Sequence, residues 1–199
     1  MIKKLLSTIT LLIILQTFFQ QGFYAQSLAP DFIWSKNFGG TGYDGSTDIA
    51  VDNSGNIIVT GFFDSTVTFG TTQLIPFGSA DIFVAKFNSN GDVIWARSAG
   101  GFEFDRGYSV TVDDFDNIIV TGTFSGLAFF SPFEIQTNGN TDVFVAKYSP
   151  DGSVLWVKNY GDTGYEYGFD ISVDNLNNIL VTGPFRILVL LLCHFIYSF

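Results

Sequence analysis

The chain is organised by an internal repeat of 61 residues. Its three tryptophans, Trp34, Trp95 and Trp156, follow one another at intervals of 61 residues. Other motifs keep this interval without insertion or deletion: Val-Thr-Gly at 59, 120 and 181, and Asp-x-Phe-Val-Ala-Lys at 81 and 142. A fold for this chain must therefore be assembled from copies of one structural unit, each packed on its neighbours.

Each unit is predicted to form four short antiparallel strands. In the first unit the expected strands are 47–51, 56–63, 81–87 and 92–98. Two turn sequences separate them, Asp52-Asn53-Ser54-Gly55 and Asn88-Ser89-Asn90-Gly91. Asp and Asn bond the backbone two residues on, and glycine takes the left-handed position of a hairpin loop.

The strands contain continuous apolar runs, such as Ile57-Ile58-Val59, which indicate burial on both faces of a sheet. Small four-stranded sheets stacked side by side are the blades of a β-propeller. We therefore predict an all-β chain, a partial and open β-propeller of four-stranded antiparallel blades with about two and a half 61-residue repeats. A flat or solenoidal all-β stack is the main alternative, but its usual repeat is shorter.

The string GGTGYD at 39–44 matches the opening of a calcium-binding β-roll repeat. Such a roll needs a glycine pair about every nine residues. The next pair here is Gly100-Gly101, one full unit later, so stacked half-sites cannot form. The β-roll interpretation is rejected.

Residues 1–25 have the order of a secretory signal peptide. A basic start at Lys3 and Lys4 precedes the apolar run Leu5–Phe19, and cleavage is expected after Ala25. We therefore expect a secreted protein, extracellular or at the cell surface. An uncleaved anchor would need about 20 apolar residues, more than this run provides.

The remaining chain is strongly acidic. The net charge is −10, or −12 without Lys3 and Lys4, which argues against nucleic acid or anionic lipid as a partner. The single cysteine, Cys193, cannot form an internal disulfide, so packing must hold the fold together.

The unit resembles the β-propeller repeat of secreted bacterial proteins, the SBBP repeat. The resemblance rests on Val-Thr-Gly, Asp-x-Phe-Val-Ala-Lys and Gly-x-Val-x-Trp at fixed spacing, and covers residues 31–185. It divides this region into repeats at about 34–94, 95–155 and a partial one at 156–185. The resemblance implies a bacterial protein of the cell exterior with a binding or scaffolding role and no family catalytic residues.

Residues 186–199 match neither earlier unit and form a hydrophobic tail outside the repeat register. One interpretation is a membrane anchor or partner helix, but the apolar run is too short to span a bilayer. The interpretation we favour is a truncated copy of a longer protein, with a tail read out of frame. No stable membrane insertion is then expected after signal cleavage, and open blade edges are expected to promote self-association.

The recurring acidic residues are candidate calcium ligands, because Ca²⁺ prefers carboxylate and carbonyl oxygens. The candidates are Asp44, Asp52, Asp105, Asp113 and Asp174, with Glu166 at the position equivalent to Asp105. The favoured interpretation is structural, since aspartate at the start of a turn bonds its own backbone. We expect no catalytic metal and no cofactor.

The aromatic residues divide into two expected groups. Trp34, Trp95 and Trp156 are expected to pack between blades. Tyr43, Phe104 and Tyr165, beside the glycine-rich connections, are the best exposed candidates for a ligand surface. Lys86 and Lys147 end apolar strands and are expected to pair with an acidic group of the adjacent blade.

An enzyme is not expected. The only histidine, His194, lies in the tail, so the repeats offer no Ser-His-Asp or Cys-His arrangement. The predicted function is a secreted or cell-surface, non-catalytic β-propeller protein that binds an unknown protein or glycan. The alternative is a fragment of a carbohydrate-active propeller enzyme with its catalytic residues in missing blades; a third interpretation is a truncated product without function.

Overall fold

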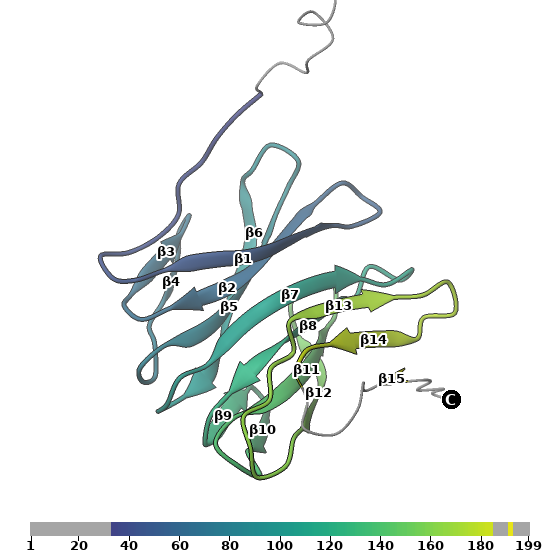
Figure 1. Cartoon of the computed structure of the whole chain (residues 1–199). Coiled ribbons are helices and arrows are strands. Elements are labelled where there is room, and N and C mark those ends of the chain that lie inside the picture. Colours follow the sequence, from purple (N-terminus) through teal and green to yellow (C-terminus); the bar gives the residue numbers. More distant parts are fainter. Residues whose placement is uncertain (1–32, 185–190, 193–199) are drawn as a thin grey trace, which may run out of the picture. The chain divides into compact units, whose positions relative to one another are not determined.

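The computed structural model describes residues 33–184 and 191–192, and every regular element in this part is a β-strand (Figure 1). The expected signal peptide lies outside the described residues, as does most of the tail. Residues up to Ser35 form a unit separate from Lys36–Phe199, and the fold below is that of the second unit. Among the described residues, no helix is long and apolar enough to cross a membrane.

The structure contains two complete four-stranded antiparallel blades, and each takes its last strand mainly from the start of the following repeat. Blade 1 consists of β1 (Gly45–Val51), β2 (Ile57–Phe63), β5 (Asp81–Phe87) and β6 (Val93–Gly101), paired in that order. Blade 2 consists of β7 (Arg106–Val112), β8 (Ile118–Phe124), β11 (Asp142–Tyr148) and β12 (Val154–Tyr160), again paired in sequence order. The expected strands are thus confirmed to within three residues at each end.

The third repeat is incomplete. It supplies β13 (Asp170–Val173) and β14 (Ile179–Thr182), which pair antiparallel. The short strand β15 (Leu191–Leu192), from the hydrophobic tail, pairs with the other side of β14. It takes the place that β5 and β11 occupy in the complete blades, and it was not predicted from the sequence.

Two hairpins occupy the stretches that vary between repeats, and the sequence did not predict them. In the first repeat the hairpin is β3 (Val67–Phe69) with β4 (Thr72–Leu74); in the second it is β9 (Leu127–Phe130) with β10 (Phe133–Gln136). Strand β9 pairs with β6 of blade 1 through Gly100 and Gly101. The bridge between Gly39 and Thr68 is the same contact one repeat earlier. Each hairpin therefore pairs with the segment that comes just before the first strand of its own blade.

The stacking of the repeats is that of a β-propeller. The first strands of the repeats, β1, β7 and β13, lie side by side in Figure 1. One buried cluster, including Trp95, Val120 and Phe144, joins blade 1 to blade 2. Another, including Val143 and Ile171, joins blade 2 to the third repeat. The side chains of β5 and β8 are buried along their whole length, as the continuous apolar runs predicted.

The tryptophans of the two complete blades lie at the blade interfaces. Trp95 is 6% exposed, and its indole N–H donates to the carbonyl oxygen of Pro150 in blade 2 at 3.1 Å. A Cβ on Gly152, in the same turn, would lie 2.8 Å from the ring, so this glycine admits the indole. Trp156 is half-buried against the cluster between blade 2 and the third repeat. Trp34 belongs to the N-terminal unit that ends at Ser35, and it is 38% exposed.

Candidate functional site

The aspartates at the β1–β2 and equivalent turns organise their own loops. Both Ser54 N–H and Asn56 N–H donate to Asp52 Oδ1, at 2.9 and 2.8 Å. Asn56 Nδ2 donates to the other oxygen at 2.9 Å. The pattern repeats at Asp113 and Asp174, and the left-handed position is taken by Gly55, Asp116 and Asn177 in turn. The Asx turns expected from the sequence are present, and calcium binding at these residues stays a prediction.

Lys86 and Lys147 pair with these turn aspartates. The Nζ–Oδ2 distance is 2.8 Å for Lys86–Asp52 and 2.7 Å for Lys147–Asp113. Each pair lies within one blade, so the expectation of an acidic partner in the adjacent blade was wrong. The lysine is the second-last residue of the third strand of its blade and reaches across the second strand to the turn after the first.

The two ion pairs lower the pKa of their aspartates. Burial alone would raise the pKa of Asp52 and Asp113. Hydrogen bonds from the paired lysine and from the turn asparagine outweigh burial, and hold both pKa values below the ordinary range. Both carboxylates are therefore ionised at neutral pH and serve the fold.

A second pair of carboxyl groups lies beneath the glycine-rich connection between the blades. Asp81 is 3% exposed and Asp105 is fully buried. A Cβ on Gly100, between them, would lie 2.8 Å from Asp81 Cγ and 2.9 Å from Asp105 Oδ2. Gly101 N–H donates to Asp105 Oδ2 at 2.6 Å and Ser125 N–H to Oδ1 at 3.0 Å, whereas Asp81 Oδ1 has no partner among the described residues.

Burial raises the pKa of both groups. The pKa of Asp81 rises to about 6 despite backbone hydrogen bonds from Phe77 and Gly78. The pKa of Asp105 rises to about 7, through burial and through the charges of Asp81 and Glu103, although two backbone N–H groups oppose the rise. The sequence analysis selected Asp105 as a candidate site residue but not Asp81, although Asp81 is the first residue of the recurring Asp-x-Phe-Val-Ala-Lys motif.

The same arrangement recurs one repeat later with Asp142 and Glu166. Asp142 is fully buried and Glu166 is 2% exposed. Neither oxygen of Glu166 has a hydrogen-bond partner in the described part of the chain. Burial raises the pKa of Glu166, and the charges of Asp162 and Asp142 add to the rise. Asp44, the first member of this series, accepts a hydrogen bond from Gly40 N–H at 2.8 Å.

The three aromatic residues chosen as ligand-surface candidates are exposed. Tyr43 is 67% exposed, Phe104 42% and Tyr165 63%. Backbone contacts hold each connection: Tyr43 N–H donates to Asp64 Oδ1 at 2.8 Å, while Phe104 and Tyr165 form parallel bridges with Ala80 and Thr141. The side chains therefore point outward from backbone that is fixed.

Two of these aromatic residues belong to one row of stacked side chains. The ring centroids of Tyr43 and Phe62 are 5.4 Å apart. Arg106 Cζ lies 4.1 Å from the centroid of Phe62 and 4.4 Å from that of Phe104. We call Tyr43, Phe62, Arg106 and Phe104 the aromatic–arginine row. Tyr165 lies one repeat further along and is not part of it.

The sequence missed the two central members of the row, and the signal that marks them is departure from the repeat. Phe62 is replaced by Thr123 and Pro184 at the equivalent positions, and Arg106 by Gly45 and Tyr167. Within the described residues Arg106 makes no ion pair, and its Nε is buried without a hydrogen-bond partner. The distinctive feature of this surface is therefore the Arg106 guanidinium, which lies between the rings of Phe62 and Phe104 without a paired carboxylate among the described residues.

No metal centre accompanies these groups in the part of the chain that the structure describes. There, no three histidine, cysteine, aspartate or glutamate side chains are grouped so as to hold a metal ion. The buried carboxyl groups at the blade junctions occur as pairs, and Lys86 and Lys147 are engaged by the turn aspartates.

Comparison with known proteins gives one relevant similarity. No family model matches the chain, so membership of the SBBP repeat family stays a prediction. Over 155 residues the chain is 28% identical to an uncharacterized WD repeat-containing protein of Acanthamoeba polyphaga mimivirus. The aligned part covers 69% of this chain and 11% of the relative, so the chain spans only a small part of that protein's length.

The similarity agrees with the stacked blades but does not make the units WD repeats. A WD repeat is about 40–45 residues long and carries Gly-His and Trp-Asp signatures. The unit here is 61 residues long, and its only histidine lies outside the repeats. The extra length accommodates the inserted hairpins β3–β4 and β9–β10. The chain is a β-propeller-like repeat protein similar to a WD repeat-containing protein.

Proposed function

We propose that this chain is part of a secreted or cell-surface, non-catalytic β-propeller protein that binds a protein or glycan through the aromatic–arginine row. The observation that carries the proposal is Arg106, stacked between Phe62 and Phe104 and free of any ion pair among the described residues. Tyrosine and arginine are enriched among the residues that dominate binding energy at protein interfaces.

The side chains of the row are suited to bind ligands that present the face of a ring or a planar group. Aromatic faces accept the apolar face of a sugar or an aromatic side chain, and the tyrosine hydroxyl offers a polar edge. An arginine stacked on rings keeps donors at its edge, which suits carbonyl and hydroxyl oxygens. Because the chain carries a net charge of −10, this cation also stands out electrostatically from its surroundings.

The carbohydrate-active enzyme alternative has less support. A glycosidase requires one pair of carboxyl groups at a substrate site. The two pairs described here, Asp81 with Asp105 and Asp142 with Glu166, occupy equivalent positions and are almost fully buried. Groups that recur in each repeat and are closed to solvent are expected to serve the scaffold.

Binding by the row is tested with the full chain on arrays of glycans and of exposed bacterial proteins. The double variant Tyr43→Ala/Phe104→Ala should lower the affinity for any ligand found by roughly tenfold or more, the usual loss at dominant interface residues. Phe115→Ala is the matched control, since Phe115 is 72% exposed and lies beyond the opposite end of β7. Equal losses in both variants would sink the proposal, and retention of the chain in the cytoplasm would sink its secreted part.

A further inference from the structure

The segment just before the first strand of a blade packs against that same blade, and the structure contains this junction twice. The first junction lies at the start of blade 1 and the second between blade 1 and blade 2. In the first junction Lys36 Nζ lies 2.6 Å from Asp92 Oδ1, across the interface. Nearby, the ring of Phe38 packs on Phe87 and Phe69, with centroids 4.9 and 5.8 Å apart. This junction is thus closed by an ion pair outside and by three rings inside.

The second junction keeps the cation and loses its carboxylate. Arg97 stands at the position of Lys36, but Ser153 replaces Asp92. Ala99 replaces Phe38, so one ring is missing, and Tyr148 replaces Phe87, so a hydroxyl is added. Among the described residues no carboxylate pairs with Arg97, whose Nη1 donates to Ala96 O at 3.0 Å and whose Cζ lies 5.7 Å from the Trp95 ring.

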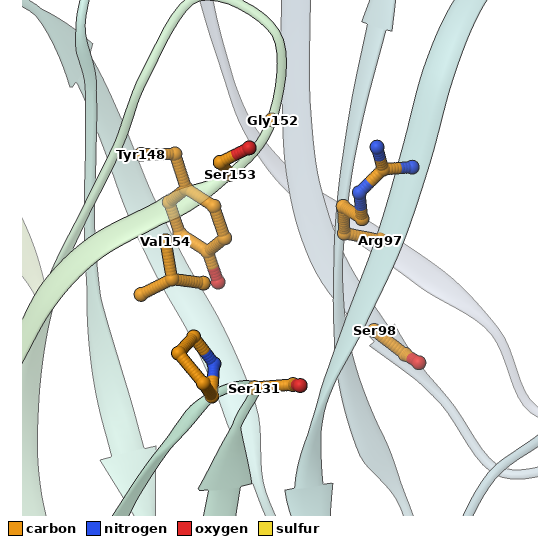
Figure 2. A pocket seen from close by; sticks show the side chains of 8 residues that line it. Arg97, Ser98, Ser131, Tyr148, Gly152, Ser153 and Val154 are labelled. Atoms are coloured by element: carbon orange, nitrogen blue, oxygen red, sulfur yellow. The ribbon is translucent and has the colours of Figure 1, made fainter.

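At this second junction a pocket of about 350 Å³ lies between the blades, and Arg97, Tyr148 and Ser153 are among its lining residues. Figure 2 shows the Ser153 hydroxyl on one side of it and the Arg97 guanidinium on the other, with the Tyr148 ring between Ser153 and Ser131. The pocket is lined by Arg97, Ser98, Ser131, Pro132, Tyr148, Gly152, Ser153 and Val154.

The side-chain hydroxyls that line the pocket are not used by the rest of the described chain. The hydroxyls of Ser98, Ser131, Ser153 and Tyr148 make no hydrogen bond to another described residue. Tyr148 is only 1% exposed, so its free hydroxyl is held in place by packing. The nearby Asp151 is turned into its own loop, where it accepts hydrogen bonds from the Ser149 hydroxyl and from Ser153 N–H.

We propose that this pocket binds a carboxylated monosaccharide, such as a hexuronic acid, with the ligand carboxylate on Arg97. The ligand carboxylate would take the role that Asp92 has in the first junction. Guanidinium binds carboxylate through two parallel hydrogen bonds, and the hydroxyls of Ser131, Ser153 and Tyr148 match the hydroxyls of a sugar ring. The volume is at the lower end for ligand pockets, which limits the ligand to about one ring. The site is separate from the aromatic–arginine row and does not depend on it.

The test is a calorimetric or NMR titration of the full chain with glucuronate, alongside glucose and acetate. Saturable glucuronate binding at least about tenfold tighter than either is expected, because glucose lacks the charge and acetate lacks the ring hydroxyls. Absence of saturable glucuronate binding by the folded wild type overturns the proposal. Acetate binding as tight as glucuronate overturns its sugar component.

Two variants locate the site. Ser153→Asp restores the ion pair of the first junction, so it should abolish glucuronate binding without lowering the melting temperature. Arg97→Met should weaken binding by roughly tenfold or more, since it removes a charged hydrogen bond. Lys158→Met is the matched control, because Lys158 holds the equivalent position one repeat later, and it should leave binding unchanged. Full binding by a folded Ser153→Asp variant would disprove the assignment.

Discussion

Blade 1 and blade 2 carry the same Asp–Lys ion pair in different surroundings. The side chains of Lys86 and Asp52 are 6% and 1% exposed, whereas those of Lys147 and Asp113 are 21% and 2% exposed. Blade 1 is followed by a complete blade, and Lys86 Nζ lies 3.4 Å from the carbonyl oxygen of Pro150 in it. Blade 2 is followed, in the described residues, by the shorter strands β13, β14 and β15. The repeat therefore determines that the lysine and aspartate pair, and the following blade determines how far the pair is shielded from solvent.

The tryptophans should show this difference most strongly. Trp95 is 6% exposed and hydrogen-bonded across the interface, while Trp156 is half-buried. Trp95→Ala should therefore lower the free energy of unfolding by about 4 kcal/mol, and Trp156→Ala by about 2 kcal/mol, since the cost follows the buried volume removed. Urea unfolding at pH 7 measures both. Equal losses would mean that the following blade adds nothing to the packing.

The ion pairs should show the next largest effect. Lys86→Met leaves Asp52 as a buried, uncompensated charge and should cost about 3 kcal/mol, whereas Lys147→Met should cost about 2 kcal/mol because water reaches that pair. A double-mutant cycle with Asp52→Asn or Asp113→Asn isolates each pair from the rest of the structure. A larger coupling for the more exposed pair would contradict the comparison.

The buried acids at the blade junction predict a pH dependence. The pKa values of Asp81 and Asp105 rise from an ordinary 3.8 to about 6 and about 7, so the folded state binds more protons than the unfolded state in this range. The free energy of unfolding should therefore fall as the pH rises from about 4 to about 7, and then level off. Asp81→Asn should make this slope shallower and stabilise the protein at pH 8 by about 2 kcal/mol, with little effect at pH 4.

The opposite sign is expected in the third repeat. Hydrogen bonds from the Asn178 side chain and backbone lower the pKa of Asp174. Its contribution to stability is therefore present above pH 4 and is lost as the pH falls through its lowered pKa. Asp174→Asn should accordingly destabilise at pH 8, and the loss should shrink as the pH falls below about 4. Denaturant titrations across this pH range measure both variants, and a loss of stability at pH 8 from Asp81→Asn would refute the argument.

The sequence predicted what is local and missed what depends on neighbours. The turns at Asp52 and Asp113 and the strands around them follow from Asx, asparagine and glycine chemistry within a few residues, and all are present. The hairpin β9–β10 was missed because its pairing partner, β6, belongs to the preceding blade. The partner of Lys86 was misplaced because the sequence does not show that a lysine on the third strand reaches across the second.

The candidate site was predicted in part for the same reason. Exposed Tyr43 and Phe104 could be chosen from their glycine neighbours, and the structure adds Phe62 and Arg106 between them. The burial of Asp81 beside Asp105 could not be predicted from the sequence, because it depends on how closely both side chains approach Gly100 in the fold. Positions where one repeat departs from the others were visible in the sequence, but only the structure shows which departures lie together.

The smallest expected effect comes from exchanging the two outer junctions. Asp92→Ser removes the carboxylate from an exposed pair with Lys36, and Ser153→Asp supplies one to Arg97. Exposed ion pairs contribute little and are screened by salt, so the melting temperature should fall and rise, respectively, by about 1–2 °C in low salt. Both shifts should shrink in about 0.5 M salt, where the screening length falls to about 4 Å. If Ser153→Asp instead lowered the melting temperature in low salt, the Arg97 guanidinium would not face the position of that carboxylate, and the two junctions would differ in geometry as well as in charge.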